Sequence, residues 1–141
     1  MEPEPLAWEA LVASLVHGLP QPVKHEAALD GATVFVGGDP GEVVVRLTAD
    51  ELTVSEFAVE WQGPNTPVTR PIELGHVHWA LLPGVEVMRV LNALIEATRH
   101  SRRSKYRQCP MCEQVRPPES MNEEDVCDSC AKGQEPEPSG W

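Results

Sequence analysis

The sequence has no apolar run that approaches the length of a membrane span. A helix needs about 20 consecutive apolar residues to cross a bilayer, and the apolar stretches of this 141-residue chain are far shorter. A signal peptide is also missing, because the first residues, Met-Glu-Pro-Glu-Pro, are acidic where a signal peptide is basic. These two absences predict an intracellular, cytoplasmic protein without a membrane partner.

Positive charge is scarce, with 11 lysines and arginines against 22 acidic residues and a formal net charge of −11. Residues 1–98 carry 4 basic and 14 acidic side chains, and residues 108–141 carry 2 basic and 8 acidic ones. Such an acidic surface repels nucleic acid phosphate over most of its area. It suits a basic protein partner, or it serves solubility alone.

Recognisable catalytic motifs are absent from the sequence. It contains no Gly-x-Ser-x-Gly elbow, no glycine-rich phosphate loop before a helix and no His-Glu-x-x-His. The glycine-rich segment 37–41 is expected to turn between strands, so it lacks the helix N-terminus that a phosphate cradle uses. The carboxylates are scattered, and no pair can be singled out. The sequence therefore predicts a protein that is not an enzyme.

The pair His76 and His78, two residues apart on an expected strand, is a candidate for a second functional site. Alternate residues of a strand share a face, so the two imidazoles could bind a second metal or act as an acid–base pair. No third ligand is identifiable, and His17 and His25 are candidates only by elimination. The alternative interpretation is a solvent-facing strand with alternating polar residues.

Hydrophobic patterns predict two helices and about five strands. Residues 6–17 and 84–104 carry apolar side chains at helical spacing. Between them, residues 29–82 alternate in short runs separated by turns rich in glycine and proline, which is typical of antiparallel strands. Because no strand–helix–strand alternation occurs, the predicted fold class is α+β, with one antiparallel sheet and both helices on one face.

Three details of the strand region extend this outline. The apolar residues of segment 52–61 change parity near Ser55, which predicts a β-bulge or a bend. Pro71 indicates an edge position for its strand, since proline cannot donate a hydrogen bond to a neighbouring strand. The last strand is expected over residues 76–82, where apolar residues alternate once more.

All four cysteines of the chain lie in two Cys-x-x-Cys pairs separated by 14 residues: Cys109, Cys112, Cys127 and Cys130. Two residues between cysteines allow a tight turn that aims both sulfurs at one ion. Zn²⁺ prefers four such ligands in a tetrahedron, and a reducing compartment disfavours disulfides. The pattern predicts one structural zinc ion, with two disulfides or an iron–sulfur cluster as alternatives.

This cysteine-rich segment resembles a zinc ribbon or a minimal treble-clef module. The resemblance covers about a fifth of the chain and implies a structural zinc, whose four thiolates leave no open position for a catalytic water. Two details depart from the commonest pattern: Glu113 stands where many such modules have glycine, and Gly133 follows Cys130 closely. The resemblance implies no single function, because such modules bind DNA, RNA or proteins.

The chain is expected to have three parts. An α+β domain occupies residues 1–104, a zinc module occupies residues 105–132, and a disordered tail occupies residues 133–141. The module is too small to bury enough apolar area alone, so the zinc is expected to hold it together. The tail repeats Glu-Pro and has no periodic apolar pattern, as expected for a disordered segment.

A short basic segment precedes the first cysteine pair. It holds five cations, no acid and one aromatic side chain, and these residues are Arg99, Arg102, Arg103, Lys105, Tyr106 and Arg107. One interpretation is a stripe that contacts phosphate beside the zinc module. The other is a helix end, where the helix dipole favours each cation by about 0.3–1 kcal/mol. A patch that docks an acidic protein surface fits equally well.

These observations predict a non-catalytic adaptor or regulator that binds a protein partner through its zinc module and the adjoining helix. Apolar residues around the metal would supply the contact, and the candidates are Met111, Val115, Pro117, Pro118, Met121 and Val126. The alternative is a nucleic-acid-binding or transcription-associated protein that uses residues 99–107 and the zinc module. Salt dependence of binding distinguishes the two, since phosphate contacts weaken steeply with added salt.

Overall fold

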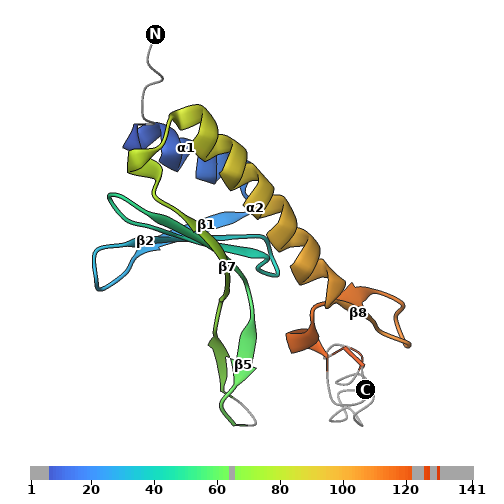
Figure 1. Ribbon diagram of the computed structural model, residues 1–141. Coiled ribbons are helices and arrows are strands. Elements are labelled where there is room, and N and C mark those ends of the chain that lie inside the picture. The colour runs from blue at the N-terminus through green and yellow to red at the C-terminus, as the bar shows by residue number, and fades with distance from the viewer. Residues whose placement is uncertain (1–6, 64–65, 122–125, 128–129, 131–141) are drawn as a thin grey trace. The chain divides into compact units, whose positions relative to one another are not determined.

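The computed structural model describes residues 7–63 and 66–121, together with residues 126, 127 and 130. The chain divides into two compact units, residues 1–102 and residues 103–141 (Figure 1). Each unit has its own cluster of buried residues. The prediction that the first part folds independently of the cysteine-rich part stays a prediction.

The first unit combines two helices with a five-stranded antiparallel sheet, which confirms the predicted α+β class. Figure 1 shows both helices, α1 (Trp8–Gly18) and α2 (Gly84–Ser104), on the same side of this sheet. The strands follow the spatial order β1-β2-β3-β4-β7. Their bounds are β1 (Val23–Ala27), β2 (Thr33–Gly37), β3 (Val43–Leu47), β4 (Leu52–Glu56) and β7 (Ile72–Val77).

One face of the sheet is apolar and forms the core with the helices. Phe35, Val45 and Val54 lie side by side on three neighbouring strands, and each is at most 1% exposed. Because side chains alternate along a strand, Val43, Leu47 and Leu52, each two positions away, continue the same apolar face and are buried. The helices contribute the buried residues Leu11, Leu15, Val87, Leu91 and Ile95. Regular apolar spacing in both element types therefore builds one shared core.

The parity change predicted near Ser55 corresponds to a register shift between Val54 and Ser55 in the β4–β7 pair. Beyond β4 the chain leaves the five-stranded sheet and forms a separate ribbon of β5 (Val59–Trp61) and β6 (Pro67–Thr69). Figure 1 shows this ribbon extending away from the sheet. Pro71 lies between β6 and β7, and β7 is an edge strand.

Two parts of the strand region differ from the prediction. The edge strand β1 was not predicted, because its sequence Val-Lys-His-Glu-Ala exposes four of five residues and shows no apolar alternation. The strand predicted over residues 76–82 is wrong beyond Val77, where the 3-10 helix η1 (Trp79–Leu81) begins. The indole of Trp79 turns into the core and donates a hydrogen bond to the carbonyl oxygen of Thr48 at 3.0 Å. This contact favours a turn over a continued strand.

The second unit is built from a short hairpin and irregular segments. Strands β8 (Arg107–Gln108) and β9 (Val115–Arg116) pair in an antiparallel fashion, and the 3-10 helix η2 (Pro118–Ser120) follows. Met121 then forms an isolated bridge with Cys127. The tail predicted over residues 133–141 lies outside the described residues.

Candidate metal centre

The β8–β9 hairpin positions the first cysteine pair. The backbone N–H of Cys109 donates to the carbonyl oxygen of Gln114 at 2.9 Å, and the N–H of Glu113 donates back to the carbonyl oxygen of Cys109 at 2.8 Å. These bonds close a tight turn around the pair. Glu113 adopts a φ of 62°, a left-handed conformation that glycine enters freely and other residues enter at a cost. A glycine at this position would adopt the same conformation without that cost.

Four cysteine sulfurs converge at this turn. The Sγ atoms of Cys109, Cys112, Cys127 and Cys130 lie within 4.8 Å of one another. Those of Cys112 and Cys127 are 3.7 Å apart. A tetrahedral zinc ion with Zn–S bonds of about 2.3 Å has sulfur–sulfur edges of about 3.8 Å. The cluster can therefore hold a metal ion such as zinc.

The contacts between sulfurs favour a shared ion over separate disulfides. All four cysteines are free thiols. The 3.7 Å contact joins Cys112 of the first pair to Cys127 of the second, across the 14 residues between the pairs. A disulfide within each Cys-x-x-Cys pair would not require the two pairs to meet. A single ion with ligands from both pairs does require this.

Hydrogen bonding and mutual contact set the acidity of the thiols. Backbone N–H groups, that of Cys127 first, lower the pKa of the Cys109 thiol to about 6. The Cys127 N–H lies 3.5 Å from the Cys109 sulfur. Side-chain hydrogen bonding with Cys127 and then burial raise the pKa of Cys130 to about 12. Thiolates this close repel one another, and a divalent cation bound between them would offset that repulsion.

The surroundings of the sulfurs are apolar and partly open. Cys109 and Cys127 are 0% and 1% exposed. Met121 packs against this buried pair and is itself partly buried, so little of its side chain is open to a partner. Met111 and Val115 are 52% and 62% exposed. Of the apolar residues predicted to make contact, these two are the most accessible among those with large side chains.

The structure divides the basic segment into two groups. Arg102 is 2% exposed, donates from Nε to the carbonyl oxygen of Gly41 at 3.0 Å, and lies 5.2 Å from the centre of the Phe57 ring. The Nε of Arg99 lies 3.6 Å from the carboxylate of the buried Glu42. Within the first unit, both arginines therefore hold α2 against the segment that contains Gly41 and Glu42. Arg102 is too deeply buried to face a phosphate.

The other members of the basic segment belong to the second unit. Arg103, Lys105 and Arg107 are exposed, and Tyr106 is partly buried. One sequence signal separates Arg102 from them, because it lies four residues after the buried Thr98 and continues the inward stripe of α2. The run of positive charges over residues 99–107 makes this difference in helical position easy to overlook in the sequence.

The predicted histidine pair is close in space, and within the described residues it has one neighbouring carboxylate. The rings of His76 and His78 are 5.9 Å apart in an edge-to-face arrangement, and Nδ1 of His78 lies 3.0 Å from a carboxylate oxygen of Glu51. Both histidines are exposed. Within the described part of the chain, they join no group of three potential metal ligands. Whether the protein is an enzyme stays a prediction made from the sequence.

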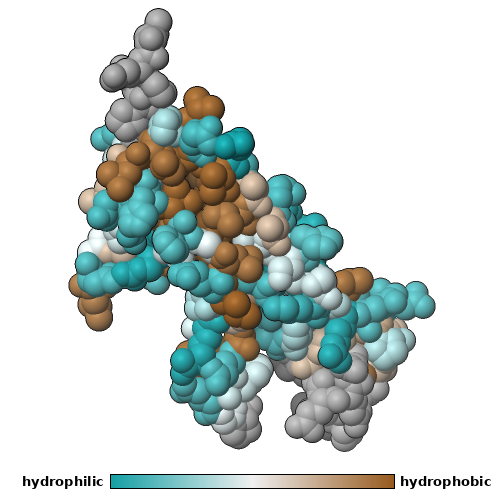
Figure 2. Space-filling model, in the orientation of Figure 1, coloured by the Kyte–Doolittle hydropathy of each residue, from teal (hydrophilic) through white to brown (hydrophobic). Residues whose placement is uncertain are grey.

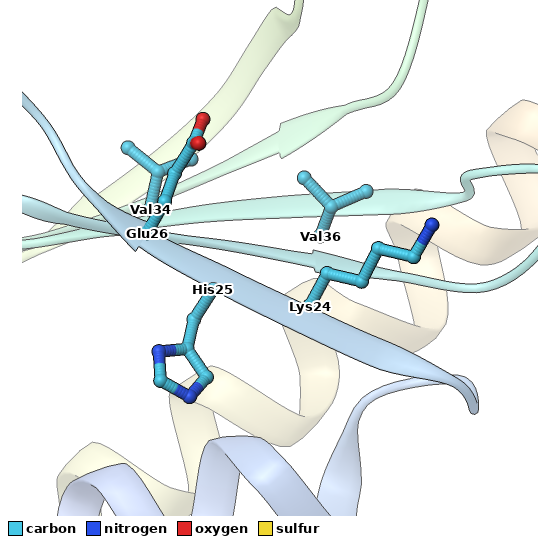
Figure 3. A pocket seen from close by; sticks show the side chains of 5 residues that line it. All are labelled: Lys24, His25, Glu26, Val34 and Val36. Atoms are coloured by element: carbon cyan, nitrogen blue, oxygen red, sulfur yellow. The ribbon is translucent and has the colours of Figure 1, made fainter.

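An open pocket of about 240 Å³ lies on β1 and β2, lined by Lys24, His25, Glu26, Val34 and Val36 (Figure 3). In Figure 3 the side chains of Lys24, Glu26 and the two valines stand on one side of the strands, and His25 points to the other side. Two opposite charges thus border an apolar floor. This arrangement does not select a ligand of either charge.

No family model, curated protein or solved structure matches this chain. In the part of the chain that the structure describes, neither helix is long and apolar enough to cross a membrane. The description of the metal centre therefore rests on the geometry and chemistry of its own four cysteines.

Proposed function

We propose that this protein is a non-catalytic adaptor or regulator that docks a protein partner through a structural zinc module. The convergence of four cysteine sulfurs within 4.8 Å of one another carries the proposal. Four thiolates complete the coordination of zinc and leave no position for a reacting water. The ion would then hold together a unit whose buried cluster is small.

The module is proposed to be of the zinc-ribbon or minimal treble-clef type. The first cysteine pair lies in the turn of the β8–β9 hairpin, and the sulfurs of the second pair converge on that turn. The proposed type can be checked by solving the structure of the zinc-bound protein.

Met111 and Val115 are the proposed contact residues for the partner. Met111 lies between the cysteines of the first pair, and Val115 lies on β9 beside the same turn. Their exposed fractions of 52% and 62% leave apolar surface that a partner can cover. Because the metal would fix the turn that carries Met111, loss of zinc would disorder the module and abolish its contact with the partner.

The test combines metal analysis with capture of partners from cell extract. Native mass spectrometry is expected to find one zinc ion per chain, lost on chelation and in Cys112→Ser. A partner captured by the wild type should be lost from Cys112→Ser and from the double variant Met111→Ser/Val115→Ser, although the double variant keeps its zinc. Leu29→Ser is the matched control, because Leu29 is a fully exposed apolar residue of the first unit. A chain without zinc, or a double variant that keeps every partner, contradicts the proposal.

Exposed cations favour a second candidate, contact with nucleic acid through Arg103, Lys105 and Arg107. These three are the cations of the basic segment whose side chains are exposed. Three phosphate contacts would give a slope of roughly −3 for the logarithm of affinity against that of salt. A salt titration with a labelled oligonucleotide measures this slope, and Arg103→Glu/Lys105→Glu should abolish binding. An apolar docking site would respond little to either change.

A further inference from the structure

The first unit carries an exposed apolar patch that is independent of the proposed zinc module. The patch comprises Trp8, Leu81, Leu82 and Val85, which are 38%, 80%, 37% and 76% exposed. These residues come from the start of α1, from the end of η1 with the residue after it, and from the first turn of α2. Figure 2 shows hydrophobic residues gathered over α1 and the start of α2. Exposed apolar residues that gather in one region of a surface mark interaction sites.

A rigid base supports the patch. The ring of Trp8 lies 6.0 Å from the ring of Trp79. Trp79 is 6% exposed, and its indole N–H donates to the carbonyl oxygen of Thr48 at 3.0 Å. The N–H of Leu81 donates to the carbonyl oxygen of His78 at 3.0 Å and closes the turn that presents Leu81. A surface already held in place loses little conformational entropy when a partner covers it.

Acidic residues adjoin the patch residues along the chain and at η1. Glu9 follows Trp8 on α1, and Glu86 follows Val85 on α2. Asp50 lies against η1, where its carbonyl oxygen accepts a hydrogen bond from the N–H of Ala80 at 3.5 Å. Arg89 pairs with Glu86, so these two charges offset each other. Among the described residues, the negative charge of the border therefore comes from Glu9, Asp50 and Glu51, whose carboxylate lies 3.0 Å from Nδ1 of His78.

This negative border distinguishes between the kinds of partner that could cover the patch. Two copies of the chain that met through the patch would bring their acidic borders together, and like charges facing each other disfavour such a dimer. An anionic lipid surface would be repelled for the same reason. A helix with an apolar stripe flanked by lysine or arginine would bury the patch and pair with its border. We propose that Trp8, Leu81, Leu82 and Val85 dock a basic amphipathic helix of a partner protein.

The test uses a defined probe in place of the unknown partner. An 18-residue amphipathic peptide of leucine and lysine is labelled and titrated with the full zinc-loaded chain, with fluorescence anisotropy as the readout. We expect saturable binding that weakens roughly tenfold or more in Leu81→Ser/Val85→Ser, since two exposed apolar side chains are lost from the contact. Leu29→Ser, another substitution at an exposed leucine, should bind as the wild type does. A leucine and glutamate peptide of the same pattern should not bind.

Several outcomes would overturn the proposal. Equal affinity of the wild type and Leu81→Ser/Val85→Ser would show that the peptide binds elsewhere on this acidic protein. Equal binding of the glutamate peptide would remove the role of the border. Sedimentation that finds a wild-type dimer and a monomeric double variant would make a second copy the occupant. Circular dichroism of the double variant checks its fold, which should be intact because both replaced side chains are more than 70% exposed.

Discussion

Replacing Arg102 with alanine tests whether the end of α2 is a structural anchor or part of a ligand-binding stripe. The guanidinium donates to the carbonyl oxygen of Gly41 and lies over the Phe57 ring. A hydrogen bond from a charged group contributes about 1.5–3 kcal/mol, and a cation–π contact contributes about 0.5–2 kcal/mol. Because one side chain makes both contacts, they are not additive. We expect the free energy of unfolding to fall by about 2–4 kcal/mol.

Urea denaturation followed by tryptophan fluorescence and circular dichroism measures this change. Arg103→Ala is the matched control, because Arg103 is the exposed neighbour and an exposed ion pair contributes at most about 1 kcal/mol. Arg102→Lys keeps the charge without the planar guanidinium, so its loss should be intermediate. A loss below about 0.5 kcal/mol for Arg102→Ala, or equal losses at the two positions, would refute the anchoring role.

Three further changes test other parts of the molecule. Removal of zinc by chelation or by Cys112→Ser should increase hydrogen exchange in residues 105–130. The five-stranded sheet should stay protected, because it has its own buried cluster. Loss of protection throughout the chain would show that the two parts fold together. Glu113→Gly removes the side chain from a left-handed position and should stabilise the zinc-bound module by up to about 1 kcal/mol. Competition for zinc with a chromogenic chelator measures this change, and weaker zinc retention by the variant would contradict the prediction. Gly37→Ala should lower the free energy of unfolding by about 1–3 kcal/mol, since the added Cβ would lie 2.9 Å from both Leu19 Cβ and the Pro20 carbonyl oxygen. Gly18→Ala is its control, because nothing lies within 4 Å of a Cβ there, and urea titrations that rank the two glycine variants equally would disprove the packing argument.

The helices and the central strands could be predicted because burial imposes a regular period on their sequences. The helix expected over residues 84–104 is observed as Gly84–Ser104. Strands β2 and β3 lie in the middle of the sheet and carry the apolar residues that reveal them. The residues after Val77 keep the same alternation but turn into η1, because the contact of Trp79 with Thr48 is made across 31 residues of sequence. No local pattern reports such a contact.

The cysteine cluster and the arginines show the same limit within the candidate sites. Metal coordination requires close pairs of ligands, so the spacing of the four cysteines is visible in the sequence. Arg102 is buried while its neighbour Arg103 is exposed, because Arg102 contacts Gly41, which lies 61 residues earlier in the chain. Met121 was expected to be open to a partner, yet it packs against the buried cysteines. Exposure of a single side chain follows from tertiary packing, which a single sequence does not display.

The edge strand β1 has a consequence for how this protein behaves at high concentration. An edge strand offers unpaired backbone groups to the sheets of other molecules, and charged side chains along it discourage that pairing. Lys24 and Glu26 alternate along β1 and are exposed. The charges that conceal the strand in the sequence therefore also protect the newly made chain from aggregation. Apolar residues at these two positions would make β1 easy to recognise in the sequence, and the protein would be prone to aggregate.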